Sequence, residues 1–300
     1  MSKRDYIIRF LLIIKKLRNS RYATFKEINE YLHREFELLD KPKNISIRTF
    51  QRDVNDIRTI FNIDIQCNCS NQYYIAEDDS SGVNYRVLEA FDIFHSLSLG
   101  KQVTSYVLLE KKCPLGTEHF YGLLHAIKNR FIIMFSYQKY NEPIASIREV
   151  EPYALKEFKG RWYLLSKDYK DNMVKTFGLD RIQELEITKK KFIYPADLNP
   201  NAYFENCFGV IVPEDSNPEE IILSFEPLQG KYIKSYPLHE SQKIIADNKD
   251  ELRIKLYLCE TYDLIMELLT IGDKLKVIKP QSLIDEIYDI AENILKKYKE

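Results

Sequence analysis

The chain has 300 residues, and because single hydrophobic cores rarely grow beyond about 250–300 residues, two or three domains are expected. Hydrophobic residues make up 45% and charged residues 30%, which is typical of a globular protein and excludes a chain that is disordered throughout. The net charge of −1 does not indicate a nucleic-acid partner, but the distribution of charged residues along the chain gives a modest indication of one. Residues 1–76 carry 14 Lys and Arg against 9 Asp and Glu, whereas residues 217–300 carry 12 against 16. A basic N-terminal region suits a polyanion, although random variation between domains would also produce it.

Cysteine usage and hydropathy predict no disulfide framework, no metal or cofactor, and no membrane partner. The five cysteines form no CxxC pair. Cys67 and Cys69 could chelate a metal together with a distant histidine, or they are simply two small residues of a hairpin. The apolar run from Phe10 to Ile14 is too short to span a bilayer and is followed by basic residues, so a cytoplasmic location is expected.

The first 76 residues predict three helices and a hairpin, which is the outline of a winged helix. Tyr6 to Leu17 is an apolar helical segment, and Thr24 with Glu27 forms a capping box that starts a second helix. Ser46 can cap a third helix. The inward positions of this helix are expected to be Phe50, Val54, Ile57 and Phe61. Strands are predicted at Ile63–Gln66 and Tyr73–Ala76.

The rest of the chain predicts a short helical region and then two units that mix strands and helices. Helical patterns extend from Asn84 towards Leu109 and from Glu118 to Lys128. Strands follow at Phe131–Tyr137, Ile147–Glu157, Arg161–Lys167 and Met173–Leu179, with a tight turn at Lys159-Gly160. After a loop from Pro195 to Pro213, strands are predicted at Ile221–Phe225, Ser241–Ala246, Leu252–Leu258 and Leu275–Ile278. Helices are predicted there at Pro227–Tyr236, Tyr262–Leu269 and Ser282–Tyr298. Antiparallel strands that alternate with helices favour an α+β class.

The outward side chains at the start of the third helix are suited to reading DNA. Arg48, Thr49, Gln51 and Arg52 lie there, and Arg pairs bidentately with guanine as Gln does with adenine. The helix N-terminus and Ser46 favour a nearby phosphate. These residues would also make an ordinary solvated face, with Arg52 and Asp56 paired at i, i+4.

Five short motifs resemble WYL-domain transcriptional regulators. Ser46-x-Arg48-Thr49-Phe50-x-Arg52-Asp53-Val54 is similar to the recognition-helix signature of the winged helices that precede WYL domains, and Tyr73-Tyr74-Ile75 is similar to the strand of their wing. Gly160-Arg161-Trp162-Tyr163-Leu164-Leu165 contains the triplet that names the family. Its flanks, Arg148 to Tyr153 and Lys175 to Ile182, match further family motifs. The break at Glu37–Ile45 departs from the pattern, because it is longer than the usual turn of 3–4 residues.

The resemblance implies a multidomain α+β chain with four regions. These are a winged helix-turn-helix (1–78), a helical linker (79–117), a WYL effector-binding domain (118–195) and a C-terminal α+β extension (196–300). The WYL domain is expected to be a small SH3/Sm-like β-barrel and the extension to be ferredoxin-like. On this basis the DNA-binding residues are Ser46, Arg48, Thr49, Gln51, Arg52 and Tyr73. The effector-binding residues are Tyr137, Arg148, Tyr153, Arg161, Tyr163 and Arg181, with Asp180 orienting Arg181. Tyr163 could equally belong to the core.

No enzyme signature is present, so the chain is not expected to be an enzyme. GxGxxG, the P-loop, HExxH and GxSxG do not occur. Glu149 and Glu151 share a strand face and could do acid/base work, but a solvated face explains them as well. His119 and His125 are interpreted as surface residues.

The sequence therefore predicts a homodimeric regulator that binds a double-stranded DNA operator and senses an effector, either a nucleotide or a single-stranded nucleic acid. The alternative is an accessory protein that binds RNA or single-stranded DNA and uses its winged helix for protein contacts. Sequence-specific duplex binding distinguishes the first from the second.

Overall fold

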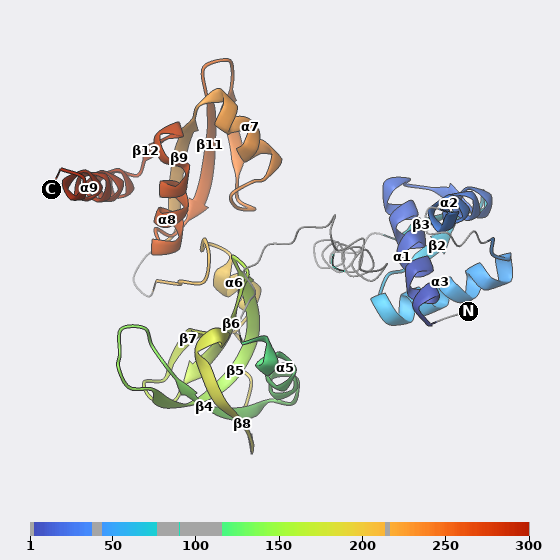
Figure 1. Ribbon diagram of the computed structural model, residues 1–300, viewed down its shortest axis with the longest axis horizontal. Coiled ribbons are helices and arrows are strands. Elements are labelled where there is room, and N and C mark those ends of the chain that lie inside the picture. The colour runs from blue at the N-terminus through green and yellow to red at the C-terminus, as the bar shows by residue number, and fades with distance from the viewer. Residues whose placement is uncertain (1–2, 38–43, 77–89, 91–115, 214–216, 300) are drawn as a thin grey trace. The chain divides into compact units, whose positions relative to one another are not determined.

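The computed structural model describes residues 3–37, 44–76, 90, 116–213 and 217–299 (Figure 1). The chain divides into two compact units, residues 1–111 and 112–300, which are considered separately. The described residues form a mixed α+β, multidomain protein with three antiparallel sheets. Apart from position 90, the helices predicted between Asn84 and Leu109 lie outside the described residues, as does most of the long break between the second and third helices.

Residues 3–37 and 44–76, the described part of the first unit before position 90, form three helices and a small sheet, as the sequence predicts. The helices are α1 (Lys3–Asn19), α2 (Phe25–Glu37) and α3 (Ile47–Phe61). The strands are β1 (Ala23–Thr24), β2 (Ile65–Cys67) and β3 (Gln72–Ile75), in the order β1-β3-β2. The predicted capping box begins α2: the Thr24 backbone NH donates to Glu27 Oε2 at 2.7 Å, and the Glu27 NH donates to Thr24 Oγ1 at 3.3 Å. The two-residue β1 was not predicted, because two residues are too short to show an alternating pattern.

One apolar core holds these elements together. It buries Ile13 of α1, Ile28 and Leu32 of α2, and Phe50 and Ile57 of α3. The spacing of the buried residues in α2 and α3 follows the helical period, so each helix turns one stripe inward and leaves the opposite face in water. α3 ends at Asn62, which adopts a left-handed conformation at φ 54°.

In the second unit, residues 117–191 form a helix and a five-stranded antiparallel sheet. A 3₁₀ turn at Thr117–His119 leads into α5 (Phe120–Asn129). The strands are β4 (Phe131–Tyr137), β5 (Ser146–Phe158), β6 (Arg161–Asp168), β7 (Met173–Gly178) and β8 (Ile182–Lys191). They pair in the order β7-β6-β5-β4-β8. α5 packs Leu123 and Ala126 into a core shared with Ile133, Val150 and Leu164, and Figure 1 shows the helix beside the sheet.

Two elements of this region were not predicted from the sequence. β8 was not recognised because nearly all of its residues are exposed or half-buried and its second half is Thr-Lys-Lys-Lys, so it shows no apolar alternation. The segment 195–213, expected to be a loop, contains the short helix α6 (Pro200–Phe204), which places Phe204 in a second core with Tyr153, Leu165 and Phe192. The turn between β5 and β6 is as predicted, since Lys159 and Gly160 both have positive φ values, 47° and 73°.

The C-terminal region is a four-stranded antiparallel sheet packed against helices. Its strands are β9 (Glu219–Phe225), β10 (Lys243–Asp247), β11 (Leu252–Leu258) and β12 (Leu275–Lys279), in the order β10-β11-β9-β12. Its helices are α7 (Pro227–Ser235), α8 (Tyr262–Ile271) and α9 (Gln281–Lys297). Ile233 of α7, Leu264 of α8 and Leu283 of α9 are buried in one core with the strands. All seven elements were predicted. The narrower assignments of an SH3/Sm-like barrel and a ferredoxin-like fold remain predictions.

Candidate functional site

The outward face of α3 is the candidate DNA-reading surface. Arg48, Gln51 and Arg52 are exposed there, with Asn55 on the next turn. The Arg52 guanidinium lies 5.7 Å from the centre of the Tyr6 ring, which limits its range of orientations. Arginine and glutamine side chains in the first turns of a helix are the groups that recognise guanine and adenine in a major groove.

Ser46 and Thr49 form the N-terminal cap of α3. The Ser46 side chain accepts a hydrogen bond from the Thr49 backbone NH at 3.1 Å, and the two hydroxyl groups lie 2.9 Å apart. This cap satisfies one of the free NH groups at the helix start. Both residues therefore have a structural role at the place where a phosphate was expected to bind.

A buried ion pair, which the sequence analysis did not identify, holds α3 against α1. Arg9 donates through Nε to Asp53 Oδ2 at 2.5 Å and through a terminal nitrogen to Oδ1 at 2.6 Å, and both side chains are fully buried. A bidentate pair fixes orientation as well as distance. The signal was present in the sequence, because Asp53 interrupts the apolar face of α3 at a position that the helical period turns inward. Asp53 thus holds in place the helix that carries Arg48 and Arg52.

Tyr73, one of the predicted DNA-binding residues, packs against α3. Its ring packs edge-on against Phe50 at a centroid distance of 4.8 Å, on the buried side of α3, and this burial raises the pKa of its hydroxyl. Since Phe50 faces the core, the half-buried Tyr73 supports α3 by packing against Phe50. The neighbouring Tyr74 instead donates its hydroxyl to Gln66 across the hairpin, at 2.9 Å.

In the second unit, Arg181 is at the centre of a group that we call the Arg181 cluster: Tyr137, Tyr140, Arg161, Tyr163, Asp180 and Arg181. The Arg181 guanidinium lies 5.2 Å from the centre of the Tyr137 ring and 5.0 Å from that of Tyr140. Asp180 accepts from the Tyr140 hydroxyl at 3.0 Å and from Arg161 at 3.4 Å. Tyr163 is half-buried, and its hydroxyl, whose pKa is raised chiefly by burial, lies within electrostatic range of Arg161 and Asp180.

Local backbone geometry brings the cluster together. The Tyr137 hydroxyl accepts a hydrogen bond from the backbone NH of Gly178 at 3.2 Å, which joins the end of β4 to the end of β7. A Cβ at position 178 would lie 2.6 Å from Asp180 Oδ1 and 2.7 Å from an Arg181 terminal nitrogen, so a larger residue there would displace these two side chains. Asp180 and Arg181 follow at once in a 3₁₀ turn, Leu179–Arg181.

One donor in the cluster has no partner within the described part of the chain. Arg181 Nε is buried and makes no hydrogen bond there, and its distance to Asp180 Oδ1 is 3.7 Å. A buried guanidinium NH without an acceptor is costly, so the arrangement favours an added acceptor at this position. The structure therefore brings together four of the predicted effector residues, Tyr137, Arg161, Tyr163 and Arg181, and adds Tyr140.

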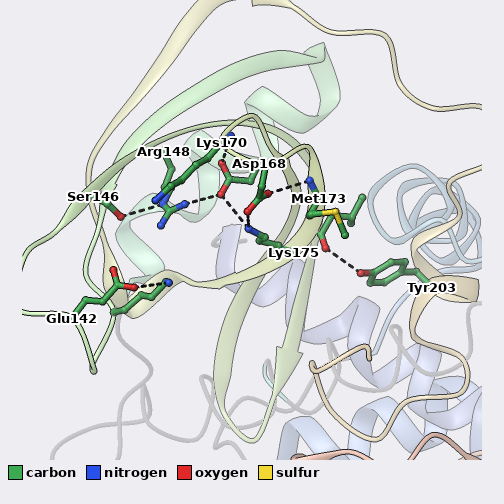
Figure 2. Close-up of polar contacts among 11 residues, drawn as sticks. Glu142, Ser146, Arg148, Asp168, Lys170, Met173, Lys175 and Tyr203 are labelled. Carbon is green, nitrogen blue, oxygen red and sulfur yellow. Dashed lines mark hydrogen bonds and ion pairs between the residues drawn. The ribbon is translucent and has the colours of Figure 1, made fainter. Parts of the chain in front are cut away.

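Arg148 is a correction to the predicted effector set. Its side chain is 5% exposed and donates to Asp168 Oδ2 at 2.9 Å, while Asp168 is fully buried (Figure 2). Lys175 lies 3.7 Å from the same carboxylate, and Asp168 Oδ1 also accepts from the Lys170 backbone NH at 3.0 Å. Arg148 neutralises a buried carboxylate and is not available to a ligand. Asp168 was missed because no local pattern connects two residues 20 positions apart.

Tyr153 is the second correction to that set. It lies at a register shift between β5 and β6, where Pro152 pairs with Ser166 but Ala154 pairs with Leu165. Its ring is buried against Phe192 and Tyr194 in the second core, and its hydroxyl donates to Glu151 at 2.7 Å. Burial and that carboxylate raise the pKa of Tyr153. Tyr153 is therefore a packing residue. Its acceptor, Glu151, also binds the Tyr169 hydroxyl at 2.8 Å.

Neither a metal site nor a membrane segment is found in the described residues. No group of three or more His, Cys, Asp or Glu is placed there to hold a metal ion. No helix in the same residues is long and apolar enough to cross a bilayer.

Comparison with protein families matches two regions of the second unit. The WYL domain model matches residues 118–187, which contain α5, the five-stranded sheet and the Arg181 cluster. The WCX domain model matches residues 217–295, which contain the four-stranded sheet and most of α9. The second unit therefore contains a region that matches the WYL domain model, followed by a region that matches the WCX domain model. We use these two names below.

Two of the solved structures that match are described here, and both are distant. Proteasome accessory factor B/C (PafBC) of Arthrobacter aurescens is 21% identical with a TM-score of 0.34; the match covers 93% of this chain and 45% of that one. A CRISPR Cas-related protein is 10% identical with a TM-score of 0.41; the match covers 100% of this chain and 87% of that one. This chain therefore spans less than half the length of the PafBC chain. No curated protein matches it significantly in sequence.

Proposed function

We propose that the chain is a DNA-binding transcriptional regulator that acts as a homodimer and responds to an effector bound by its WYL domain. The first unit would be its winged helix-turn-helix, with α3 as the recognition helix in the major groove. The order of helices and strands in this unit supports the assignment, since α2 and α3 are followed directly by the β2–β3 hairpin, which would be the wing.

The observation that carries this proposal is the two-sided construction of α3. One side is anchored in the core by Phe50, Ile57 and the buried Arg9–Asp53 pair, while Arg48, Gln51 and Arg52 point outward from the first turns. A rigid helix with forked donors on its free face can place those donors against base edges at fixed positions.

The WYL domain would bind an anionic effector, either a nucleotide or a single-stranded nucleic acid, at the Arg181 cluster. Two arginines supply forked donors for phosphate, and the exposed Tyr140 offers a ring on which a base can stack. The unpaired Arg181 Nε would gain an acceptor on binding. We further propose that the chain acts by binding and not by catalysis, and that it works in the cytoplasm.

A gel-shift experiment tests the proposed function. The purified chain would be mixed with the intergenic duplex upstream of its own gene and with an excess of unrelated duplex. We expect a discrete complex that survives the competitor and that single-stranded oligonucleotides modulate. A complex that the competitor removes completely, both with and without those oligonucleotides, would contradict site-specific binding.

A second function, binding of RNA or single-stranded DNA as the main task, is favoured by the exposed Tyr140 beside two arginines. Such a protein would use the first unit for protein contacts. Under that function, single strands bind more tightly than any duplex and Arg48→Ala leaves the affinity unchanged.

A further inference from the structure

The four-stranded sheet of the WCX domain has one face covered by helices and one open face. On the covered face, alternate residues of the two central strands, such as Leu223 and Ile254, are fully buried in one core with α7, α8 and α9. The residues between them point the other way, because side chains alternate along a strand. The strand register places the following residues on that side, which we call the open WCX face: Glu220, Ile222 and Ser224 of β9, Arg253, Lys255 and Tyr257 of β11, Lys243 and Ala246 of β10, and Lys276 and Lys279 of β12.

The charge of the open WCX face differs from that of the region to which it belongs. Residues 217–300 carry 12 Lys and Arg against 16 Asp and Glu. Five of those basic residues lie on the open face, whereas Glu220 is the one acidic residue that the register of the described strands places there. Glu251 reaches the face from the turn before β11 and accepts from Arg253 at 2.7 Å. The open face is therefore positive although the region as a whole is acidic.

Two lysines of this face lie directly opposite each other. Lys243 of β10 and Lys255 of β11 are cross-strand partners, and like charges in such a position repel each other. Lys255 also lies 3.1 Å from Glu220, but Lys243 and Lys276 are exposed and form no salt bridge with the residues that the structure describes. An anion bound between the two strands would remove this repulsion, so the arrangement favours an anionic ligand.

The ring of Tyr257 lies beside these cations and is 51% exposed. Tyr257 follows Lys255 on the same face of β11, and its cross-strand partner on β9 is Glu220. Its backbone NH donates to Ser241 Oγ at 3.1 Å, which fixes the end of the strand that carries the ring. An open sheet with an aromatic ring among basic side chains can bind the bases and the phosphates of a single strand together.

We propose that the open WCX face binds a single-stranded nucleic acid, RNA or DNA, which follows β11 across the sheet. One base stacks on Tyr257, and the next phosphates along the strand contact the Lys243–Lys255 pair. Arg253 and Lys276, which lie on either side of Ser224, bind the backbone one step further along. Neighbouring positions on the face are two residues apart, about 7 Å, so the ring and the cations form a continuous path.

This site shares no residue with α3 or with the Arg181 cluster, so it goes beyond the proposed function. A duplex fits the face less well, because its bases are stacked inside the helix and do not reach the Tyr257 ring. The lysines would attract an acidic peptide too, but such a peptide has no base to stack on that ring. Tyr257 therefore distinguishes a nucleic acid from an acidic protein.

The test measures, by fluorescence anisotropy, the affinity of the full-length chain for labelled oligothymidylate and oligouridylate of about 12 nucleotides. Arg181→Ala is the background, so that the Arg181 cluster does not contribute to binding. Adding Tyr257→Ala should weaken binding about 5- to 150-fold, because one stacked base is lost. Tyr232→Ala, which removes a ring that is 63% exposed on α7, is the matched control and should leave the affinity unchanged. The tighter of the two oligonucleotides identifies RNA or DNA as the ligand.

Salt dependence tests the phosphate contacts separately. Lys243→Ala with Lys276→Ala should reduce the slope of log affinity against log salt by about 1.4, because each phosphate contact with a single strand contributes about 0.7. Lys231→Ala with Lys297→Ala has the same charge change on exposed lysines of α7 and α9, and it should leave the slope unchanged.

Three results would overturn the proposal. They are an Arg181→Ala chain that binds neither oligonucleotide, a loss in Tyr257→Ala no larger than in Tyr232→Ala, and a polyglutamate peptide that binds as tightly as the oligonucleotides. The last result would assign the open WCX face to an acidic protein. Operator binding is read separately by gel-shift, so failure of this site and failure of the proposed function give different results.

Discussion

Two arginine–aspartate pairs in the WYL domain show how differently the same residue types can be used. Arg148 and Asp168 are buried, and the charge of each is matched, with Lys175 and a backbone NH completing the coordination of the carboxylate. Arg181 and Asp180 lie at the other end of β7, where Arg181 is stacked between two tyrosines with its Nε unpaired. The first pair is satisfied by the protein itself, whereas the second leaves bonding capacity for another molecule. A structural arginine differs from a candidate binding arginine in whether its hydrogen-bond donors already have acceptors within the protein. The residue type alone does not distinguish them.

The largest expected effect is on the stability of the WYL domain, through the Arg148–Asp168 pair. Arg148→Ala leaves Asp168 charged and buried, so the free energy of unfolding of the WYL domain should fall by about 3–5 kcal/mol. Urea unfolding can be followed through the fluorescence of Trp162, the single tryptophan of the chain, which packs against the core of this domain. Arg148→Met with Asp168→Leu removes both charges and should recover much of the loss. An Arg148→Ala protein as stable as the unaltered chain would refute the structural role.

For DNA binding, Arg48→Ala should weaken affinity for the operator by about 1–3 kcal/mol, roughly 5- to 150-fold, because a bidentate base contact is lost. Affinity for unrelated duplex should change little. Fluorescence anisotropy at fixed salt measures both, and Lys249→Ala, which removes one exposed positive charge from the WCX domain, is the control. Equal losses on operator and unrelated duplex would instead assign Arg48 to a phosphate.

Arg181→Ala should leave operator binding by the effector-free protein unchanged and abolish the response to single-stranded oligonucleotides. The physical reason is that the substitution removes the guanidinium group. The forked hydrogen-bond donors and the cation that contacts the tyrosine rings are lost together. Arg181→Lys keeps the charge but not the fork and should recover only part of the response. Lys189→Ala, an exposed cation on β8, is the control. A full response in Arg181→Ala would move the effector site away from the cluster.

Ser46→Ala tests the cap of α3. Loss of the cap should reduce the stability of the first unit by about 1 kcal/mol, measured by thermal unfolding followed by circular dichroism. Because a frayed first turn would displace Arg48, DNA affinity should fall as well. Ser46→Asp retains a cap and should preserve stability; if it also lost stability, the capping role would be wrong.

The smallest effect concerns the capping box of α2. The Thr24 backbone NH and hydroxyl hold the pKa of Glu27 below its ordinary value of 4.5. A carboxyl whose pKa is lower in the folded state stabilises the fold above the unfolded pKa, and the contribution is lost as the pH falls through the folded pKa. The unfolding midpoint of the unaltered chain should therefore drop more steeply below about pH 4.5 than that of Glu27→Gln. Parallel curves would exclude this contribution.

Most of the fold could be predicted because its elements have clear periodic patterns. The helices from Phe25 to Phe61 show the helical period in their buried residues, and the capping residues Thr24 and Ser46 mark where α2 and α3 begin. The elements that escaped prediction lack such a pattern: β8 is exposed over most of its length, and α6 is a single turn.

The candidate site could be predicted only in part, because burial and long-range partners are not local properties. Arg148 and Arg181 look alike in sequence, yet Arg148 donates to the buried Asp168, whereas the Arg181 Nε has no hydrogen-bond acceptor in the described part of the chain. The register shift at Tyr153 turns that ring into a second core, which strict alternation along β5 does not anticipate. Tyr140 was missed because it follows the strand that carries Tyr137, in a loop with no recognisable motif.

The central claim, that α3 reads a DNA sequence, is tested most directly by selection from a random duplex library with the purified full-length chain. Recovery of one enriched motif, repeated with two-fold symmetry and altered at one position by Arg48→Ala, is the predicted result. A library that yields no enriched duplex, with or without single-stranded oligonucleotides, while the protein binds single strands tightly, would contradict it.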